Sequence, residues 1–264
     1  MPYTLSAAKL QTYYHCPQAY YFRYERRLQG AAFFGSAALG TSLHQALAQI
    51  YQDWHYQDAI PRYEWIEYCW SRQTKDLTAN QMAEGRSILK RYYTDFIVSQ
   101  SVMRRPVAVE GRIQGTLQVQ NLEFTLSGRY DRLDLLEDEL ELIDYKSTKE
   151  VDPPQPDEMD LQIGLYYLAL EQRYQYSLKR LSLVYLRTGD KVSFEVTPSH
   201  RRQVESVISE LALQLRHDRK WLPFPGEQCD RCAYARYCPA ISSEPDPLPE
   251  DAKPESGLQL VLSL

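Results

Sequence analysis

Apolar residues recur at helical spacing through most of the first hundred residues. A helix is expected over residues 5–24, where Ser6 can cap the start and Pro17 should kink or end the first part. Further helical patterns cover residues 41–57, 62–76 and 79–98. The chain is therefore expected to open with a helical region.

The pattern changes from helical to alternating at Pro106. Three consecutive strands are predicted over residues 107–120, 122–136 and 139–147. Asn121 marks the first turn between them, and the pair Glu137–Asp138 marks the second. These short turns predict an antiparallel meander.

After the meander, helical and strand patterns alternate along the rest of the chain. It predicts a loop over 150–157, a helix over 157–174, a hairpin of strands 181–187 and 191–197, and a helix over 199–218. The order of helices, meander, helix, hairpin and closing helix indicates an α/β core with a mixed sheet, preceded by a helical region.

Charge and hydropathy narrow the class of protein. The net charge is −5 and the pI about 5.6, but the acidic tail after residue 242 accounts for this, because the rest holds 29 basic and 30 acidic residues. Clusters of Arg and Lys within that remainder could follow phosphates along a groove, or could be solvated helix faces. No apolar run could span a membrane and the first residues do not resemble a secretory signal, so a cytoplasmic protein is expected.

The strongest chemical pattern is a pair of aspartates with a lysine. Asp144 and Lys146 are two residues apart on one predicted strand, so their side chains share a face. Pairing through the turn at Glu137–Asp138 sets Asp131 opposite Asp144. Two carboxylates on adjacent strands can bind Mg²⁺ or Mn²⁺, and a nearby lysine can stabilise charge on a phosphate. Taken alone, the same residues could belong to an ordinary exposed hairpin.

The sequence G-R-Y-D followed by L-I-D-Y-K-S resembles motifs of the PD-(D/E)XK nuclease superfamily in its RecB-like branch. That branch also has Q-x-x-x-Y on a helix after the lysine, which Gln162 and Tyr166 match, and a histidine on an earlier helix, which His44 matches. The resemblance extends from residue 6 to residue 239.

The resemblance implies a restriction-endonuclease-like mixed sheet flanked by helices, and a deoxyribonuclease activity. It implies that His44, Asp131, Asp144 and the main-chain carbonyl of Tyr145 bind the metal ion, and that Lys146 is catalytic. Gln162 and Tyr166 are expected to contact DNA or support the site. Glu110 is either a further acidic contributor or a plain strand residue.

Four cysteines have the spacing of metal ligands. Cys229, Cys232 and Cys238 are clustered, and Cys16 lies at the other end of the chain. Four thiolates can bind a 4Fe-4S cluster or a zinc ion. The RecB-like resemblance favours the iron–sulfur cluster, because several members carry one cysteine before the nuclease core and three after it. The fifth cysteine, Cys69, is expected to be a small buried apolar residue.

The predicted organisation has four segments. They are an N-terminal helical region over 1–105, a nuclease core over 106–220, a cysteine patch over 221–242 and a flexible acidic tail over 243–264. The last six residues, Gln259–Leu264, resemble peptides that bind the bacterial sliding clamp, but they could instead fold back as an edge strand.

The main prediction is a metal-dependent DNA exonuclease or end-processing nuclease that prefers single strands or ends. The alternatives are a non-catalytic DNA-binding subunit of a recombination, repair or CRISPR-adaptation complex, and a metal protein whose carboxylates are incidental. Helicase or CRISPR-adaptation proteins are the expected partners besides DNA. No phosphate-binding loop of the G-x-x-x-x-G-K-[ST] type is present, so ATP hydrolysis is not expected.

Overall fold

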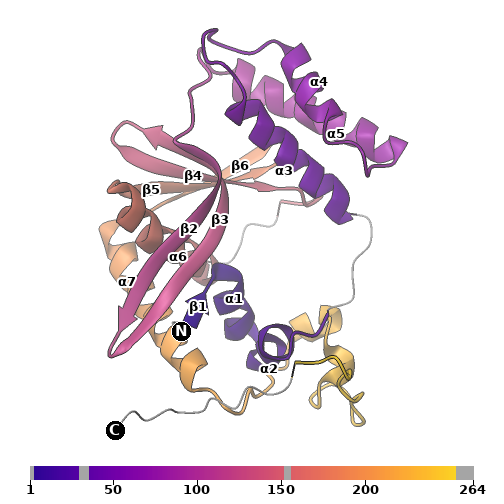
Figure 1. Ribbon diagram of the computed structural model, residues 1–264, viewed down its shortest axis with the longest axis vertical. Coiled ribbons are helices and arrows are strands. Elements are labelled where there is room, and N and C mark those ends of the chain that lie inside the picture. The colour runs from indigo at the N-terminus through magenta and orange to yellow at the C-terminus, as the bar shows by residue number, and fades with distance from the viewer. Residues whose placement is uncertain (1–2, 30–35, 152–155, 254–264) are drawn as a thin grey trace.

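The computed structural model describes residues 3–29, 36–151 and 156–253. Its centre is a six-stranded mixed sheet with helices on both faces (Figure 1). The strands are β1 Tyr3–Leu5, β2 Ala108–Val119, β3 Leu122–Leu136, β4 Glu139–Lys146, β5 Leu178–Tyr185 and β6 Asp190–Glu195. The α/β fold class and the mixed sheet predicted from the sequence are confirmed.

The long strand β3 organises the sheet. It pairs antiparallel with β2 along one edge, and its second half pairs antiparallel with β4 along the other. The predicted register is confirmed, because Arg132 pairs with Ile143 and Leu136 with Glu139. The sheet continues from β4 through the parallel β5 to the antiparallel β6.

The described helical segments surround this sheet. They are α1 Ala7–His15, α2 Pro17–Tyr20, the π-helix η1 Tyr21–Glu25, α3 Ser36–Gln52, α4 Tyr63–Ser71, α5 Ala79–Tyr92, the π-helix η2 Tyr93–Val98, α6 Pro156–Tyr174 and α7 Pro198–His217. Two short 3₁₀ turns follow, η3 Glu227–Arg231 and η4 Ala235–Tyr237. Within these described ranges, no helix combines the length and the hydrophobicity needed to span a bilayer.

The prediction of a helix over residues 5–24 is wrong at its start but correct at Pro17, where the first part was expected to end. Residues 3–5 form β1, which pairs in parallel with the first half of β3. Ser6 caps α1 as predicted, accepting a hydrogen bond from the Lys9 N–H, and the helix breaks at Cys16, before Pro17. Helical periodicity cannot reveal a three-residue strand whose partner lies more than a hundred residues away.

Two apolar cores lie on opposite faces of the sheet. One core lies between the sheet and helices α1, α6 and α7, and includes Leu142 and Leu165. The second lies between the sheet and helices α3, α4 and α5, and includes Ile143 and Tyr145. Neighbouring residues of β4 point into different cores, so the strand is buried on both sides. The C-terminal end of β4 lies between the two layers of helices.

The two ends of the described chain lie side by side, as the indigo and yellow segments of Figure 1 show. Phe22 of η1 packs against Tyr234 and Tyr237 in a third, small core. The Lys253 N–H donates to the carbonyl oxygen of Arg26 at 2.9 Å. The predicted clamp-binding or edge-strand segment, Gln259–Leu264, lies outside the described residues.

Candidate active site and cysteine site

Two adjacent strands bring the predicted aspartates and lysine to the same end of the sheet. Oδ2 of Asp131, on β3, accepts a 2.6 Å hydrogen bond from the main-chain N–H of Tyr145 on β4. On β4, Nζ of Lys146 lies 2.8 Å from Oδ2 of Asp144. The side chains of Asp131, Asp144 and Lys146 remain 16%, 17% and 33% exposed, so a substrate can reach all three.

A histidine and a glutamate gather around Asp131. His44, on α3, has Nδ1 3.0 Å from Oδ1 of Asp131. One ligand atom from each of His44, Glu110 and Asp131 lies within 4.8 Å of the others, and within the described residues this is the one such group of three. Carboxylate oxygens suit Mg²⁺ and Mn²⁺, and an imidazole nitrogen is a common additional ligand of transition metals. These residues therefore fit a divalent metal ion.

Helix α6 supports the site from the opposite side. Nε2 of Gln162 donates to Oδ2 of Asp144 at 3.1 Å and lies 3.4 Å from the hydroxyl of Tyr166. That hydroxyl donates to the main-chain oxygen of Arg129, two residues before Asp131, at 3.0 Å. The predicted helical pair thus contacts the carboxylate of Asp144 and the β3 backbone.

The carboxylates change the titration of their neighbours. Burial lowers the pKa of His44, but the hydrogen bond to Asp131 and the charges of Asp131, Asp144 and Glu110 outweigh it, so the net shift is upward. Burial and the charge of Asp131 raise the pKa of Glu110, against the opposing charges of His44 and Arg129. Both shifts report a concentration of negative charge that a divalent cation would neutralise.

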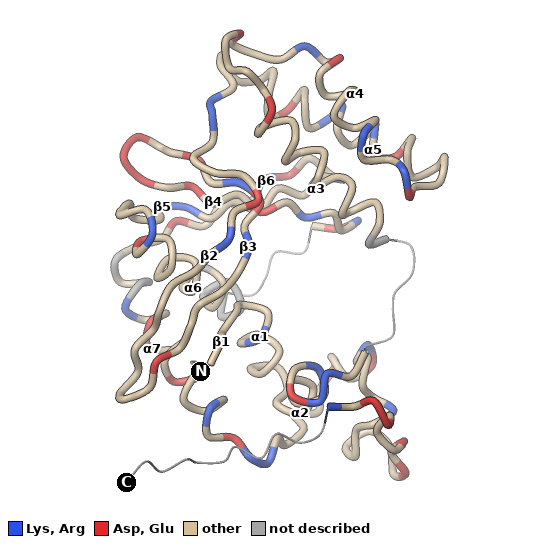
Figure 2. The backbone as a smooth tube through the Cα atoms, in the orientation of Figure 1, with Lys and Arg blue, Asp and Glu red and all other residues tan. Residues whose placement is uncertain are grey.

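The site opens into a cleft of about 1200 Å³. One wall is the face of α3 that carries His44, and the residues after β4 line the other side. Its basic residues are Arg72, Arg129, Lys149 and Arg187. Elsewhere, Figure 2 shows Lys and Arg interspersed with Asp and Glu along much of the described chain.

Several cleft residues were not predicted from the sequence. Nη2 of Arg129 lies 3.2 Å from Oε2 of Glu110, and Nε of Arg187 donates to the main-chain oxygen of Ser147 at 2.8 Å. Arg129 could have been found, because it lies inside the G-R-Y-D motif. Arg187 gave no such signal, because it reaches the cleft only through the pairing of β5 with β4.

A second cluster of candidate ligands lies at the junction of the two chain ends. Its four cysteines all line one small cavity: Cys16, Cys229, Cys232 and Cys238. Burial raises the pKa of the Cys232 thiol, a main-chain hydrogen bond opposes this, and the proximity of the other three sulfurs adds to the rise. All five cysteines are free thiols, and Cys69 is fully buried as predicted.

The mixed sheet and the carboxylate–lysine site at its end define the class of protein as a nuclease. The chain belongs to the PD-(D/E)XK nuclease superfamily, whose sequence profile matches residues 4–239. This match covers the sheet, the site residues and all four clustered cysteines.

Solved structures resemble the chain in fold. The structure named "Putative exonuclease" from Eubacterium rectale has a TM-score of 0.52 and 11% identity, covering 93% of this chain and 91% of that chain. The structure of SSO0001 has a TM-score of 0.44 and 14% identity, covering 90% and 87%. At 11% identity, the likeness to the structure from Eubacterium rectale concerns the fold alone. Among curated proteins, no sequence matches the chain significantly.

Proposed function

We propose that the chain is a metal-dependent deoxyribonuclease of the RecB-like branch, which hydrolyses phosphodiester bonds at DNA ends and prefers single strands. The observation that carries this proposal is the convergence of Asp131, Asp144 and Lys146 beside His44 and Glu110, the last two of which line the open cleft. The motifs alone could not exclude an ordinary charged hairpin.

The residues divide into ligands and groups that act on the phosphate. His44, Asp131, Asp144 and Glu110 would hold Mg²⁺ or Mn²⁺, with the main-chain oxygen of Tyr145 as a further ligand. A bound ion of this kind polarises a phosphodiester and lowers the pKa of a coordinated water molecule.

The protein's own groups supply the rest of the chemistry. Lys146 carries a positive charge beside Asp144, where it can orient the attacking water and stabilise the negative charge that grows on the phosphate. Gln162 fixes the orientation of the Asp144 carboxylate through its 3.1 Å hydrogen bond. The cationic side chains of Arg72 and Lys149 in the cleft would contact the DNA backbone.

The lysine provides the direct test. We expect Lys146→Ala to slow digestion of end-labelled single-stranded DNA in Mg²⁺ or Mn²⁺ by about 100-fold or more, the usual effect of removing one preorganised charge donor. Lys220→Ala removes an exposed lysine that does not line the cleft and is the matched control. Digestion by wild type and Lys146→Ala at equal rates, or by neither protein, would refute the catalytic assignment.

We also propose that Cys16, Cys229, Cys232 and Cys238 bind a 4Fe-4S cluster. All four cysteines line one small cavity, so one metal site could join them. Four thiolates can also bind a zinc ion, but the RecB-like resemblance favours the iron–sulfur cluster. Iron and acid-labile sulfide in the purified protein would support the cluster, and zinc without sulfide would refute it.

The proposed partner proteins are inferred from the RecB-like resemblance, and not from the geometry of the site. A helicase or a CRISPR-adaptation protein is proposed as a partner, because such proteins accompany members of the branch that the sequence resembles. Docking of Gln259–Leu264 to a sliding clamp stays a prediction. A pull-down with purified clamp, with and without the last six residues, would test it, and equal retention of both forms would end the idea.

A further inference from the structure

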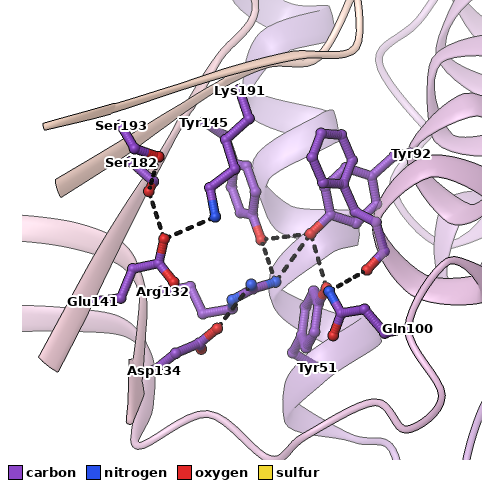
Figure 3. A network of polar contacts seen from close by, with 11 residues as sticks. Tyr51, Tyr92, Gln100, Arg132, Asp134, Glu141, Tyr145, Ser182, Lys191 and Ser193 are labelled. Carbon is purple, nitrogen blue, oxygen red and sulfur yellow. Dashed lines mark hydrogen bonds and ion pairs between the residues drawn. The ribbon is translucent and has the colours of Figure 1, made fainter. Parts of the chain in front are cut away.

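A network of buried polar side chains lies on β3, β4 and the helices packed against them (Figure 3). Its centre is Arg132, which is only 8% exposed. Nη1 of Arg132 donates to the hydroxyls of Tyr92 and Tyr145 at 3.0 and 3.1 Å, and Nη2 lies 2.9 Å from Oδ2 of Asp134. A single guanidinium therefore joins β3, β4 and α5.

The tyrosines are also bonded to one another. The hydroxyls of Tyr51 and Tyr92 lie 2.8 Å apart, and those of Tyr92 and Tyr145 lie 3.1 Å apart. The ring of Tyr51, on α3, lies 4.1 Å beneath the guanidinium of Arg132. Burial of an ion in such a network is weak evidence for stability, because well-packed apolar residues of similar volume often stabilise a core as well. Stability alone therefore gives no reason for a buried arginine at this point.

The position of the network relative to the site gives a reason for burying Arg132 there. Arg132 follows Asp131 on β3, and Tyr145 lies between Asp144 and Lys146 on β4, so their side chains point to the opposite face of the sheet. The main-chain N–H of Tyr145 donates to Asp131 at 2.6 Å. The network thus holds the backbone from which the catalytic side chains project.

The third element of the site is held by the same contacts. Helix α3 carries His44, and Tyr51 lies two turns further along it. The ring of His44 meets the ring of Tyr145 edge to face, with centroids 6.0 Å apart. Contacts of Tyr51 and Tyr145 with Arg132 therefore fix the distance from His44 to Asp131.

We propose that Arg132, Tyr145 and Tyr92 are positioning residues, which set β4 and α3 against β3 so that Asp131, Asp144 and His44 can bind one metal ion. This inference rests on the proposed nuclease function and deepens it. Groups that orient metal ligands from behind typically change metal affinity by 10–100-fold when they are altered.

Removal of a single hydroxyl tests the idea with little change in volume. We expect Tyr145→Phe to weaken Mn²⁺ binding about 10-fold, measured from the electron paramagnetic resonance signal of free Mn²⁺. At saturating metal, kcat should fall while KM for DNA stays the same, because the cleft is unchanged. Tyr92→Phe should act in the same direction, and it provides a second variant if Tyr145→Phe does not fold.

Tyr174→Phe is the matched control. It removes one hydroxyl from another tyrosine pair, Tyr130 and Tyr174, whose oxygens lie 2.8 Å apart in the other core. Arg132→Lys keeps the charge but cannot reach two hydroxyls and Asp134 together, so it should weaken Mn²⁺ binding as Tyr145→Phe does.

The outcomes separate this inference from the proposed function. Folded Tyr145→Phe and Tyr92→Phe variants with wild-type Mn²⁺ affinity would overturn the positioning role, while the nuclease assignment would stand. Equal weakening by Tyr174→Phe would also overturn it, because the effect would then be general stability. A wild-type protein that neither binds Mn²⁺ nor digests DNA would overturn the proposed function and this inference with it.

Discussion

Glu110 has an uncommon backbone conformation for a residue within a strand. Its φ is +48°, although Val109 and Gly111 on either side pair regularly with β3. A left-handed conformation costs a side chain with a Cβ about 1–2 kcal/mol. Strain of this kind gathers at functional sites, where surrounding structure maintains it. Here the conformation accompanies a carboxylate placed beside Asp131 and His44.

Relief of the strain at Glu110 should stabilise the fold but weaken metal binding. We expect Glu110→Gly to raise the free energy of unfolding of the metal-free protein by about 0.5–1 kcal/mol, since glycine adopts positive φ freely. Loss of the partly buried carboxylate, whose pKa is raised by burial and by Asp131, adds to that gain. Urea unfolding measures the stability, and Mn²⁺ titration should show weaker binding.

The control is the same substitution at a strand residue with ordinary dihedrals. Glu123 on β3 is exposed and is not among the described residues with positive φ. Glu123→Gly should therefore lower the free energy of unfolding by about 0.5–1 kcal/mol and leave Mn²⁺ binding unchanged. Loss of stability at both positions would contradict the assignment of strain to Glu110.

At the scale of elements, the sequence predicted most of the sheet because the information is local. Alternation revealed β2, β3 and β4, and the turns at Gln120 and Glu137, both with positive φ, set the register between them. The strand β1 could not be predicted, because three residues carry no period and its partner is distant. The ends of the helices were displaced by a few residues for the same lack of local signal.

The site was predictable only where a motif carried it. The sequence pointed to Asp131, Asp144 and Lys146, and the strand register brings them together as expected. Glu110 lies beside Asp131 in a backbone conformation with positive φ, and the sequence pattern does not indicate that conformation. Arg132 looked like one more basic residue, because its tyrosine partners come from three other elements.

The packing of α6 against α7 depends on a glycine. A Cβ at Gly164 would overlap Cγ1 of Val204, so alanine cannot fit without movement of one helix. We expect Gly164→Ala to lower the free energy of unfolding by about 1–3 kcal/mol, the usual cost of overpacking a core. The same variant should reduce nuclease activity, because Gln162 and Tyr166 flank this position on α6.

A double-mutant cycle identifies the clash as the cause. Val204→Ala removes the methyl groups that meet the new side chain, so the double variant should be more stable than the sum of the single effects predicts, by about 1 kcal/mol. Ser206→Ala, on the exposed face of α7, is the control and should show no coupling. Additive effects of Gly164→Ala and Val204→Ala would mean that the helices are not in contact there.

At the scale of the whole molecule, the cysteine site joins segments that are far apart in sequence. Cys16 precedes the nuclease core, whereas the other three cysteines follow α7. The small apolar core around Phe22, Tyr234 and Tyr237 is the other main connection between them. A ligand that joins Cys16 to Cys229 closes a loop of more than two hundred residues, so its binding would contribute directly to folding.

The proposed cluster between the two ends predicts how iron removal should change the Tm of matched cysteine variants. Chelation should lower the Tm of the wild type by several degrees, because a constraint on the unfolded chain is lost. Cys69→Ala, at the buried cysteine outside the cluster, should start from a lower Tm but respond to chelation equally. Cys16→Ala should be purified without the cluster and show no further change, and residues 221–253 should become sensitive to limited proteolysis. If Cys16→Ala still loses stability on chelation as the wild type does, Cys16 is not a ligand, and a metal site does not join the two ends of the chain.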